Sequence, residues 1–361
     1  MSSALKDMFD PALYRALADH LSALSPSFDR KRFLSHALDD IDSRELMPRM
    51  RRTTEAVALA LPLPYRDQLT VLRALAPRLS SGFVSIFLSD FVAQHGRDDF
   101  DVSLDALRFF TRFGSSEFAI RPFIELDQAR TLAVLLSWAA SDDEHVRRLA
   151  SEGSRPRLPW GTRLKSLVTD PSPAFPILET LRADLSLYVR KSVANHLNDI
   201  AKDHPETALD LVSNWDRSDT RTVWIIRHAL RTLIKRGHPR ALALIGAGTA
   251  AKLDVVRFQA SPRKLALGDT LMLTATLTSR AAKPQRLVID YVLHYARAGK
   301  VSIKVFKWKT LDLFPRTTIT LTKRQTIRDF STRRHHAGRH LVELQINGRR
   351  LAETAFTLSL S

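Results

Sequence analysis

The segment Asp142-Asp-Glu-His-Val-Arg-Arg148 recurs in altered form as Asp184-Leu-Ser-Leu-Tyr-Val-Arg-Lys191, with the two Val-Arg pairs 43 residues apart. A helix expected over residues 222–236 places Arg227 another 37 residues along the chain. Periods near 40 residues are typical of HEAT and armadillo repeats, whose units are helix pairs stacked on one another. The repeat therefore predicts a HEAT-like α-solenoid, in which about six units fill the first 250 residues.

The sequence on both sides of this repeat also has helical spacing. Leucines recur every three or four residues after the start signal Asp10-Pro11, and again over residues 69–79 and 132–136. Short breaks rich in Gly and Pro separate these segments. The breaks are Leu63-Pro64, Gly96, Gly114, residues 153–159, residues 170–173 and residues 237–239.

Past residue 251 the period of the apolar residues changes from 3.6 to 2, which is the period of a half-buried strand. The last two alternating stretches flank Asn347-Gly348, a strong signal for a β-hairpin. About seven short strands in this region is the number expected of an immunoglobulin-like β-sandwich. The expected strands are residues 267–278, 287–294, 301–307, 317–321, 341–346 and 351–360. The predicted protein is multidomain, with a HEAT-like α-solenoid over residues 1–250 followed by a basic immunoglobulin-like β-sandwich over residues 251–361.

The composition excludes several classes of protein. The chain has 361 residues, of which 44% are hydrophobic, so it can bury a sizeable core. It has no Cys, which excludes disulfide frameworks, cysteine nucleophiles, zinc ribbons and iron–sulfur clusters. The first ten residues carry three charges and do not resemble a secretory signal, and the longest apolar stretches are too short to cross a bilayer. We therefore expect a cytoplasmic protein with no membrane partner.

The charge distribution points to a polyanionic partner. The formal net charge is +17, and residues 251–361 alone contain 21 Lys and Arg against 7 Asp and Glu. Such a basic part beside a nearly neutral one favours nucleic-acid binding. Within it, Lys304, Lys307 and Lys309 alternate with apolar residues, a pattern that fits a DNA contact and equally an edge strand protected by charges.

No metal site is expected in this basic part. The segment His335-His-Ala-Gly-Arg-His340 holds three imidazoles, but it lies among arginines, which favours a basic loop over a metal site. We expect no metal, no cofactor and a monomeric protein.

One segment concentrates side chains suited to chemistry. Arg147-Arg-Leu-Ala-Ser-Glu-Gly-Ser-Arg-Pro-Arg-Leu-Pro-Trp-Gly161 is predicted to end a helix at Gly153 and to present Arg155, Arg157 and Trp160 in a loop stiffened by proline. Four arginines, one carboxylate and one indole favour a recognition loop for a phosphate and a cationic or flat ligand. The alternative is a turn between repeats, in which the arginines are solvated and the Trp covers the core.

Two further segments belong with this one: Ser115-Ser-Glu-Phe-Ala-Ile-Arg-Pro-Phe123 and Tyr188-Val-Arg-Lys-Ser-Val-Ala-Asn-His-Leu-Asn-Asp-Ile-Ala-Lys202. Together the three segments resemble the AlkC branch of the AlkC/AlkD family of alkylpurine DNA glycosylases. The resemblance covers about residues 1–250. It implies a HEAT-like solenoid that holds double-stranded DNA containing alkylated bases, in some members with a C-terminal immunoglobulin-like domain. It also implies excision of cationic bases, chiefly 3-methyladenine and 3-methylcytosine, without base flipping.

The resemblance implies catalytic roles for Glu117, Glu152 and Asp199 and a lesion contact for Trp160. Each acid also has a structural alternative. Glu117 follows two serines at an expected helix start, where it favours the helix dipole, and Glu152 can pair with Arg148 four residues away. Asp199 is expected on an outward-facing polar stripe of its helix.

The chemistry of such a lesion agrees with these residue types. An N-alkylated base already carries positive charge and leaves without a strong acid, and a carboxylate near C1′ stabilises the oxocarbenium-like sugar and orients water. No Lys is assigned as a Schiff-base nucleophile, so a monofunctional enzyme is expected. The alternative is a noncatalytic HEAT-like DNA-binding or scaffold protein. The predicted DNA-binding residues are Arg147, Arg148, Arg155, Arg157, Arg190, Lys191, Lys304 and Lys307.

Overall fold

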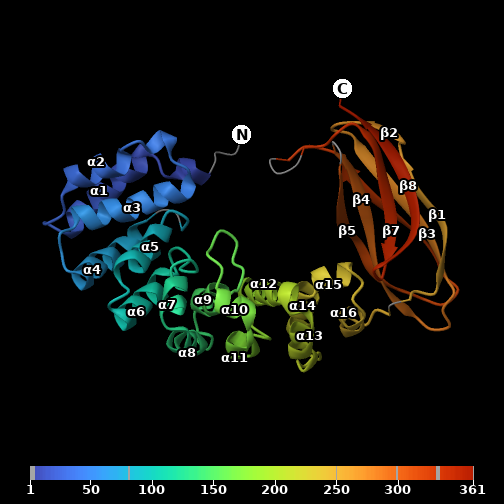
Figure 1. Ribbon diagram of the computed structural model, residues 1–361, viewed down its shortest axis with the longest axis horizontal. Helices are drawn as coiled ribbons and strands as arrows, with labels where there is room; N and C mark the ends of the chain where they lie inside the picture. The colour runs from blue at the N-terminus through green and yellow to red at the C-terminus, as the bar shows by residue number, and fades with distance from the viewer. Residues whose placement is uncertain (1–4, 80–81, 249, 298–299, 331–333, 361) are drawn as a thin grey trace. The chain divides into compact units, whose positions relative to one another are not determined.

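The computed structural model describes residues 5–79, 82–248, 250–297, 300–330 and 334–360 (Figure 1). The chain forms two compact units. The first comprises Met1–His204 with Trp215–Ile225, and the second comprises Pro205–Asn214 with Ile226–Ser361. The last helices of the chain therefore belong to the same compact unit as the strands.

The first unit is helical, as the sequence predicts, and its successive helices lie side by side in chain order (Figure 1). Its helices are α1 (Pro11–Leu24), α2 (Arg30–Leu38), α3 (Leu46–Ala60), α4 (Tyr65–Leu75), α5 (Ile86–His95), α6 (Phe100–Phe110), α7 (Arg121–Leu126), α8 (Gln128–Trp138), α9 (Glu144–Gly153), α10 (Lys165–Thr169), α11 (Phe175–Thr180), α12 (Leu187–Asp203) and most of α14 (Thr220–Ala229). The repeated segments of the sequence contain the starts of α9 and α12, which pack against each other.

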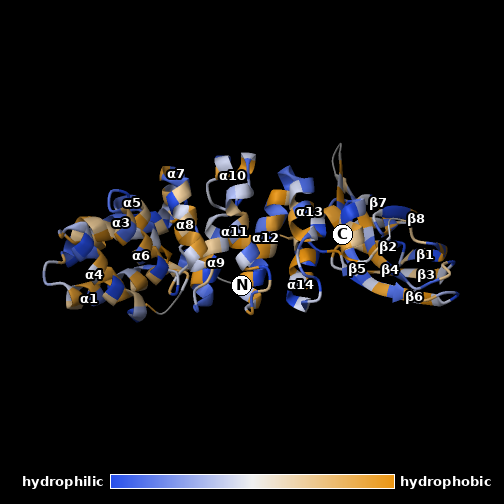
Figure 2. Ribbon diagram, turned by 90° about the horizontal axis from the view of Figure 1, so that it is seen from below, coloured by the Kyte–Doolittle hydropathy of each residue, from blue (hydrophilic) through white to orange (hydrophobic). Residues whose placement is uncertain are grey.

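Side chains just before the helices fix where they begin. The Asp10 carboxylate accepts a hydrogen bond from Leu13 N at 2.7 Å, and Asp143 and Ser186 cap α9 and α12 in the same way. Such caps satisfy backbone N–H groups that have no partner inside the helix. The apolar faces of the helices, which appear orange in Figure 2, form the core. Trp138 and Trp215 belong to it, at 5% and 3% exposure.

The second unit begins with short helices. They are α13 (Pro205–Ser213), the end of α14, α15 (Arg231–Lys235) and α16 (Pro239–Leu244). The single helix predicted over residues 222–236 is therefore wrong. Leu230 leaves the α-helical conformation (φ −83°, ψ 6°), and the chain restarts as α15, whose Lys235 carbonyl accepts a hydrogen bond from Gln345 Nε2 at 2.9 Å. The break lets this part of the chain contact the sheet.

The strands form two sheets that pack face to face. One has the order β1-β3-β6 and the other β2-β8-β7-β4-β5, and every pairing except the parallel β2–β8 is antiparallel. The strands are β1 (Leu253–Ser261), β2 (Lys264–Ala266), β3 (Thr270–Ser279), β4 (Gln285–Arg297), β5 (Lys300–Leu313), β6 (Thr318–Thr326), β7 (Gly338–Ile346) and β8 (Arg349–Ser359). The immunoglobulin-like sandwich is confirmed, but the sequence analysis missed β1, which has a bulge, and β2, which has three residues.

The position of β5 tests one of the two interpretations of its lysines. It lies at the edge of the five-stranded sheet, so the edge-strand interpretation of Lys304, Lys307 and Lys309 is confirmed. Charged side chains on such an edge prevent pairing with another chain. This role is compatible with a contact to DNA, which stays a prediction.

The hairpin turn between β7 and β8 is where the sheet meets the helices. Asn347 and Gly348 both have positive φ (48° and 77°), as the predicted two-residue hairpin requires. Gly237, which follows α15, packs against Gly348 so closely that a Cβ on Gly237 would lie 2.9 Å from the Gly348 Cα. Both positions therefore require glycine for reasons of conformation and of space.

We predict that Gly348→Ala lowers the free energy of unfolding of the second unit by about 2–4 kcal/mol, because a Cβ adds both left-handed strain and a clash with Gly237. Thermal denaturation followed by circular dichroism measures this loss. Gly268→Ala is the matched control, since Gly268 also has positive φ (106°) but no atom lies within 4 Å of its Cβ position. Equal losses in the two variants would contradict the importance of the contact.

Candidate functional site

The three acids singled out in the sequence come together in the first unit. Glu117 lies in a turn ahead of α7, Glu152 in the last turn of α9, and Asp199 near the end of α12. Two arginines join them into one network of charged groups. We call Glu117, Arg148, Glu152, Arg155 and Asp199 the acid–arginine network.

Arg155 bridges two of the acids. Its Nη1 donates to Glu152 Oε1 at 2.5 Å and its Nε to Asp199 Oδ2 at 2.8 Å. All three residues are buried, at 6%, 5% and 2% exposure respectively. Burial opposes the charged guanidinium, but the two carboxylates favour it more strongly, and the pKa of Arg155 is raised. The bridge therefore keeps two buried carboxylates paired with a permanent cation.

Arg148 connects the third acid. Its Nη1 donates to Glu117 Oε2 at 2.6 Å and to Ser115 Oγ at 3.0 Å, and its Nη2 lies 3.8 Å from Glu152 Oε1. The guanidinium also lies over the ring of Tyr188, 4.7 Å from its centroid. These contacts hold the side chains of Glu117 and Glu152 on either side of one arginine.

The structure corrects the predicted surroundings of two of these acids. Asp199 does not face outward: it is buried toward α9, where Arg155 neutralises its charge, and Lys202 Nζ binds its other oxygen at 2.9 Å. Glu117 is not at a helix start, because α7 begins only at Arg121. Glu152 does pair with Arg148, though in a buried site and with Arg155 as its closer partner.

Trp160 lines the same hollow as Ser115, whose hydroxyl binds Glu117 and Arg148 of the network. Its side chain is 71% exposed, so the alternative in which it covers the core is wrong. Its φ of 65° is unusual for a bulky residue, because the left-handed region crowds a Cβ. Strained backbone conformations are concentrated at functional sites. A loop that holds a Trp in this state therefore marks a candidate ligand contact.

Arg121 holds this loop, and the sequence analysis missed its role. Its guanidinium is 1% exposed and donates to the carbonyl oxygens of Gly153, Arg155 and Thr162, at 3.0 Å from Nη1, 2.8 Å from Nη1 and 2.8 Å from Nε. The loop that carries Trp160 is thereby tied at both ends to α7. The available signal was an arginine inside an otherwise apolar run of the segment that begins at Ser115.

A hollow of about 210 Å³ lies against Trp160. Its apolar part comes from α3, α5, α7 and the Trp160 loop, and its charged pair, Arg51 and Asp90, is joined by two hydrogen bonds of 2.8 and 2.9 Å. We call it the Trp160 hollow. Its lining includes Met47, Met50, Ile86, Phe118, Ala119, Pro122, Trp160 and Gly161.

Comparisons with known proteins fit this arrangement. A family model described as a DNA alkylation repair enzyme matches residues 111–233, which contain the acid–arginine network, and one described as the C-terminal Ig-like domain of YhaZ matches residues 254–360. The solved alkylpurine DNA glycosylase AlkC of Pseudomonas fluorescens, bound to DNA containing an abasic site analogue, is 49% identical, covers 99% of each chain and has a TM-score of 0.95. The protein YhaZ of Bacillus subtilis (strain 168), described as uncharacterized, is 41% identical over 346 residues, which is 95% of this chain and 96% of the relative.

The chain belongs to the AlkC branch of the AlkC/AlkD family of alkylpurine DNA glycosylases. This membership makes it a DNA repair glycosylase with a HEAT-like helical region and an immunoglobulin-like region. It agrees with the resemblance carried by the three motifs of the sequence.

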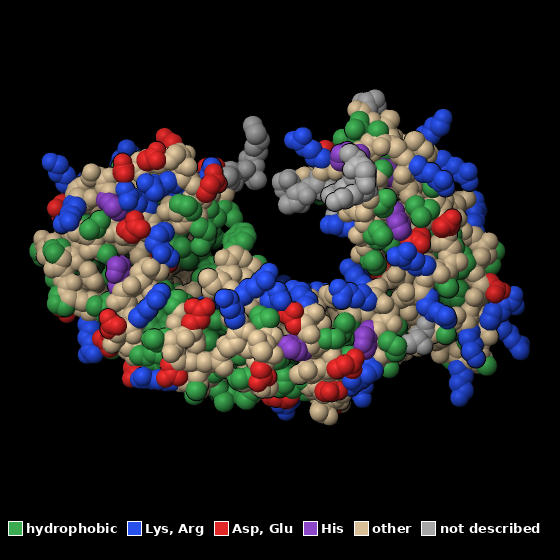
Figure 3. All heavy atoms as spheres, viewed as in Figure 1, with side chains coloured by type: hydrophobic (Ala, Val, Ile, Leu, Met, Phe, Trp, Pro, Cys, Tyr) green, Lys and Arg blue, Asp and Glu red, His purple; other side chains and the backbone are tan. Residues whose placement is uncertain are grey.

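The remaining basic residues predicted to contact DNA fall into two groups. Arg147 is occupied by Asp184, with two bonds of 2.7 and 3.1 Å, and Arg190 donates to two carbonyls near the start of α12. Arg157 pairs with Asp203, and it is partly exposed. The other group is exposed and reaches solvent, as do many basic side chains on the visible face of the sandwich (Figure 3). It comprises Lys191, Lys304 and Lys307.

His196 is a buried histidine beside the network. Its Nδ1 donates to the Ser151 carbonyl at 3.0 Å, while its Nε2 has no partner among the described residues. Burial, reinforced by the charge of Arg155, lowers the pKa of His196 to about 3, so the ring is neutral near pH 7. It therefore adds no further charge to the site.

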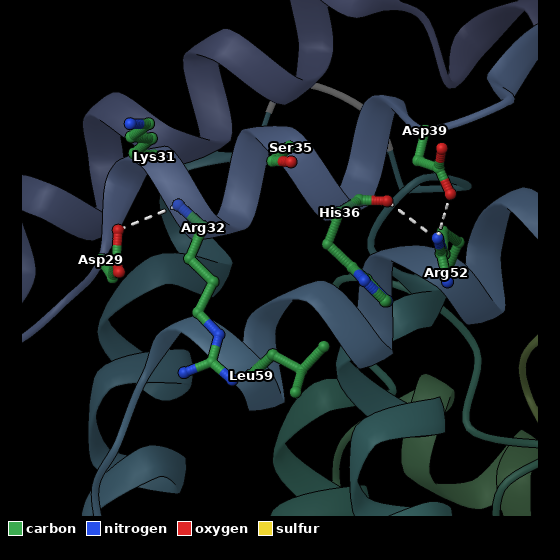
Figure 4. Close-up of a pocket in the computed structure, with 8 residues that line it drawn as sticks. All are labelled: Asp29, Lys31, Arg32, Ser35, His36, Asp39, Arg52 and Leu59. Atoms are coloured by element: carbon green, nitrogen blue, oxygen red, sulfur yellow. Dashed lines mark hydrogen bonds and ion pairs between the residues drawn. The ribbon is translucent and has the colours of Figure 1, made fainter.

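A second hollow lies on α2 and α3 (Figure 4). Its polar groups largely bind one another: Asp29 accepts from Arg32 N, and Arg52 donates to the His36 carbonyl and to Asp39. No residue of the acid–arginine network lines it. Among the described residues there is also no group of three or more His, Asp or Glu arranged to hold a metal, and no helix long and apolar enough to span a membrane.

We predict that Arg155→Gln lowers the free energy of unfolding by about 3–5 kcal/mol, because it leaves the Glu152 and Asp199 carboxylates buried without their common counterion. Denaturant unfolding measures the loss. Arg157→Gln is the control, since its partner Asp203 reaches solvent and a small change is expected. An Arg155 variant of unchanged stability but weakened DNA affinity would instead support the DNA contact predicted from the sequence.

Proposed function

We propose that this DNA glycosylase hydrolyses the N-glycosidic bond of cationic alkylated bases, 3-methyladenine and 3-methylcytosine, in duplex DNA without flipping the base. The observation that carries the proposal is the acid–arginine network beside the exposed Trp160. The similar AlkC of Pseudomonas fluorescens was solved with an abasic site analogue, which supports a reaction that removes a base from DNA.

The carboxylates differ in what they offer to a substrate. Glu117 and Glu152 each have one oxygen, Oε1 and Oε2 respectively, with no hydrogen-bond partner among the described residues. These oxygens are available to an attacking water and to the positive charge that develops at C1′. Asp199 has both oxygens bound, so its proposed role is to act through Arg155. It is then a positioning residue, whereas Glu117 and Glu152 act on the substrate.

The two arginines make these carboxylates effective in a partly buried site. Their hydrogen bonds hold the carboxylates in place before the lesion arrives, so little reorganisation is needed as charge develops on the sugar. Preorganised groups of this kind are worth about 3–4 kcal/mol of transition-state stabilisation. The leaving base is already cationic and needs no general acid.

Trp160 is proposed to contact the lesion. An exposed indole beside a cationic base contributes about 0.5–2 kcal/mol through its ring face. Its φ of 65° and the three carbonyl contacts of Arg121 fix the loop in advance. Because the indole is held at the surface, it can contact a base that stays in the helical stack.

DNA binding is proposed to use the partly exposed Arg157 and the exposed Lys191, Lys304 and Lys307. The net charge of residues 251–361 supports this role for the immunoglobulin-like region. The acid–arginine network contains no lysine, and Lys202, which binds Asp199, is assigned no role as a Schiff-base nucleophile, so a monofunctional, monomeric enzyme is proposed. A noncatalytic DNA-binding protein is the alternative, and base release from methylated duplex DNA, with chromatography of the free base, separates the two.

We predict that Glu152→Gln and Asp199→Asn each lower the single-turnover rate of base release by about 100-fold or more and leave DNA affinity nearly unchanged. The first substitution removes negative charge that the transition state needs, and the second weakens the hold of Asp199 on Arg155, which positions Glu152. Asp203→Asn is the matched control, because Asp203 also pairs with an arginine but lies four residues beyond Asp199 and is more exposed. Rates within threefold of the wild type in both test variants would refute the assignment.

A second prediction concerns the substrate. Duplex DNA containing 3-methyladenine is expected to release its base, while duplexes containing uracil or hypoxanthine are not, because a neutral base needs a proton donor that the network lacks. Chromatography of the released bases under single-turnover conditions measures this selectivity. Efficient release of uracil would overturn the proposed mechanism.

A further inference from the structure

A basic hollow of about 310 Å³ lies within the second compact unit, between its helices and the outer face of the five-stranded sheet. None of the motifs of the acid–arginine network reaches it. We call it the Arg286 hollow. Its lining residues are Arg227, Arg231, Ile234, Lys235, Ile245, Arg286, Val288, Asp290, Lys307 and Thr310.

Side chains of β4 form the floor of the Arg286 hollow, because successive residues of a strand point to opposite faces of the sheet. Leu287 and Ile289 point into the sandwich core, so Arg286, Val288 and Asp290 point to the opposite face. The helices cover that face. Lys235 Nζ donates to the Val305 carbonyl at 3.2 Å, and Ala247 forms a bridge with Arg286 in β4.

The charges of this hollow are unbalanced. Five cationic side chains line it, and Asp290 is the single carboxylate of its lining. Outside the lining, Asp312 lies 3.8 Å from Arg286 Nη1 and partly balances that charge. Burial and the charge of Arg286 lower the pKa of Arg227, as crowding of like charges requires. An anion entering the hollow would relieve this repulsion.

We propose that the Arg286 hollow binds one phosphate group of the DNA backbone. The inference rests on the proposed DNA binding and gives it a defined site outside the acid–arginine network. Guanidinium forks are suited to the oxygens of a phosphate, and the lining holds three of them: Arg227 and Arg231 from the helices and Arg286 from β4.

The lining also decides between a backbone phosphate and a free nucleotide. None of the lining residues is aromatic, so the hollow offers no surface on which a base could stack. A phosphodiester presents its charge without requiring a contact to its base. The site therefore suits a sequence-independent contact, which positions the duplex and reads no base.

Asp290 gives this site a dependence on pH. It is 1% exposed, and it faces Lys307 from β5, Gln345 from β7 and Lys235 from α15, with Arg227 and Arg231 on the helical wall. Burial, only partly offset by the two lysines, raises the pKa of Asp290 to about 6. Below that pH the carboxyl becomes neutral, and the hollow gains positive charge for a phosphate whose own charge does not change.

The first experiment removes two of the cations that line the hollow. It uses the full chain, because the helices and strands of this unit contact each other. The double variant Arg227→Gln, Arg286→Gln is compared with the wild type for binding of an unmodified duplex over a range of salt concentrations. Loss of one phosphate contact is expected to make the slope of log K against log salt shallower by about 0.9. Line broadening of pyrophosphate in ³¹P NMR, which reports on the site without DNA, is expected to be lost as well.

The control and the readouts separate the possible results. The double variant Arg257→Gln, Arg324→Gln removes the same charge from β1 and β6 of the other sheet and is expected to keep pyrophosphate binding. If the Arg227 and Arg286 variant loses pyrophosphate but keeps the salt slope, the site takes a soluble phosphate and the proposal is wrong. If both measurements are unchanged, there is no phosphate site. Base release is not a readout here, so failure of the proposed catalysis would leave these results interpretable.

The second experiment uses Asp290→Asn. The affinity of the wild type for a duplex is expected to rise between pH 7.5 and 5.5 as Asp290 takes up its proton. The Asn variant is expected to bind the duplex about threefold to tenfold tighter than the wild type at pH 7.5. In this variant the part of the rise that comes from Asp290 is expected to be absent. Comparing the two proteins cancels the titration of histidines elsewhere. A variant that binds no tighter than the wild type at pH 7.5 would contradict the role of Asp290.

Discussion

The pairing of buried carboxylates with Arg155 is the constraint on which the first unit depends. An ionised carboxylate transferred from water into the packed region between two helices is stable only beside a cation and with its oxygens hydrogen-bonded. Arg155 meets that requirement for Glu152 and Asp199 at once, from a loop rather than from either helix. Arg155 thereby joins α9 to α12 through one guanidinium, and Arg121 holds the same loop by its carbonyls.

This dependence explains which parts of the protein could be read from the sequence. Features determined by neighbours in the chain were predictable, such as the Asp10 cap, the end of α9 at Gly153 and the turn at Asn347-Gly348. The change from helices to strands was predictable for a similar reason. Each element buries one face, so its apolar residues recur with the period of a helix or of a strand. Features determined by distant partners were not predictable. In the sequence Asp199 belongs to a polar stripe of its helix, and its burial depends on the guanidinium of Arg155, 44 residues away, which binds one of its oxygens.

The same distinction applies to the candidate site and to the second unit. The three acids were found through a resemblance of motifs, and the structure adds that they share two arginines. The role of Arg121 required knowledge of where three carbonyl groups lie, which no local pattern contains. The break at Leu230 likewise depends on a sheet whose strands come later in the chain. In both cases the deciding contact is tertiary.

The proposed chemistry and the burial of the network support each other through the charge of the substrate. A neutral base would need a proton from the enzyme, whereas the acids of the network accept hydrogen bonds from Arg148 and Arg155. A cationic base removes that need, and what remains is to stabilise charge on the sugar, for which carboxylates held in place by arginines are suited. Arg148 and Arg155 then have a second effect, since they reduce the net negative charge and keep the site from attracting any cation by charge alone. In the proposed mechanism, selection therefore depends on Trp160 and on the Glu117 and Glu152 oxygens that have no hydrogen-bond partner among the described residues.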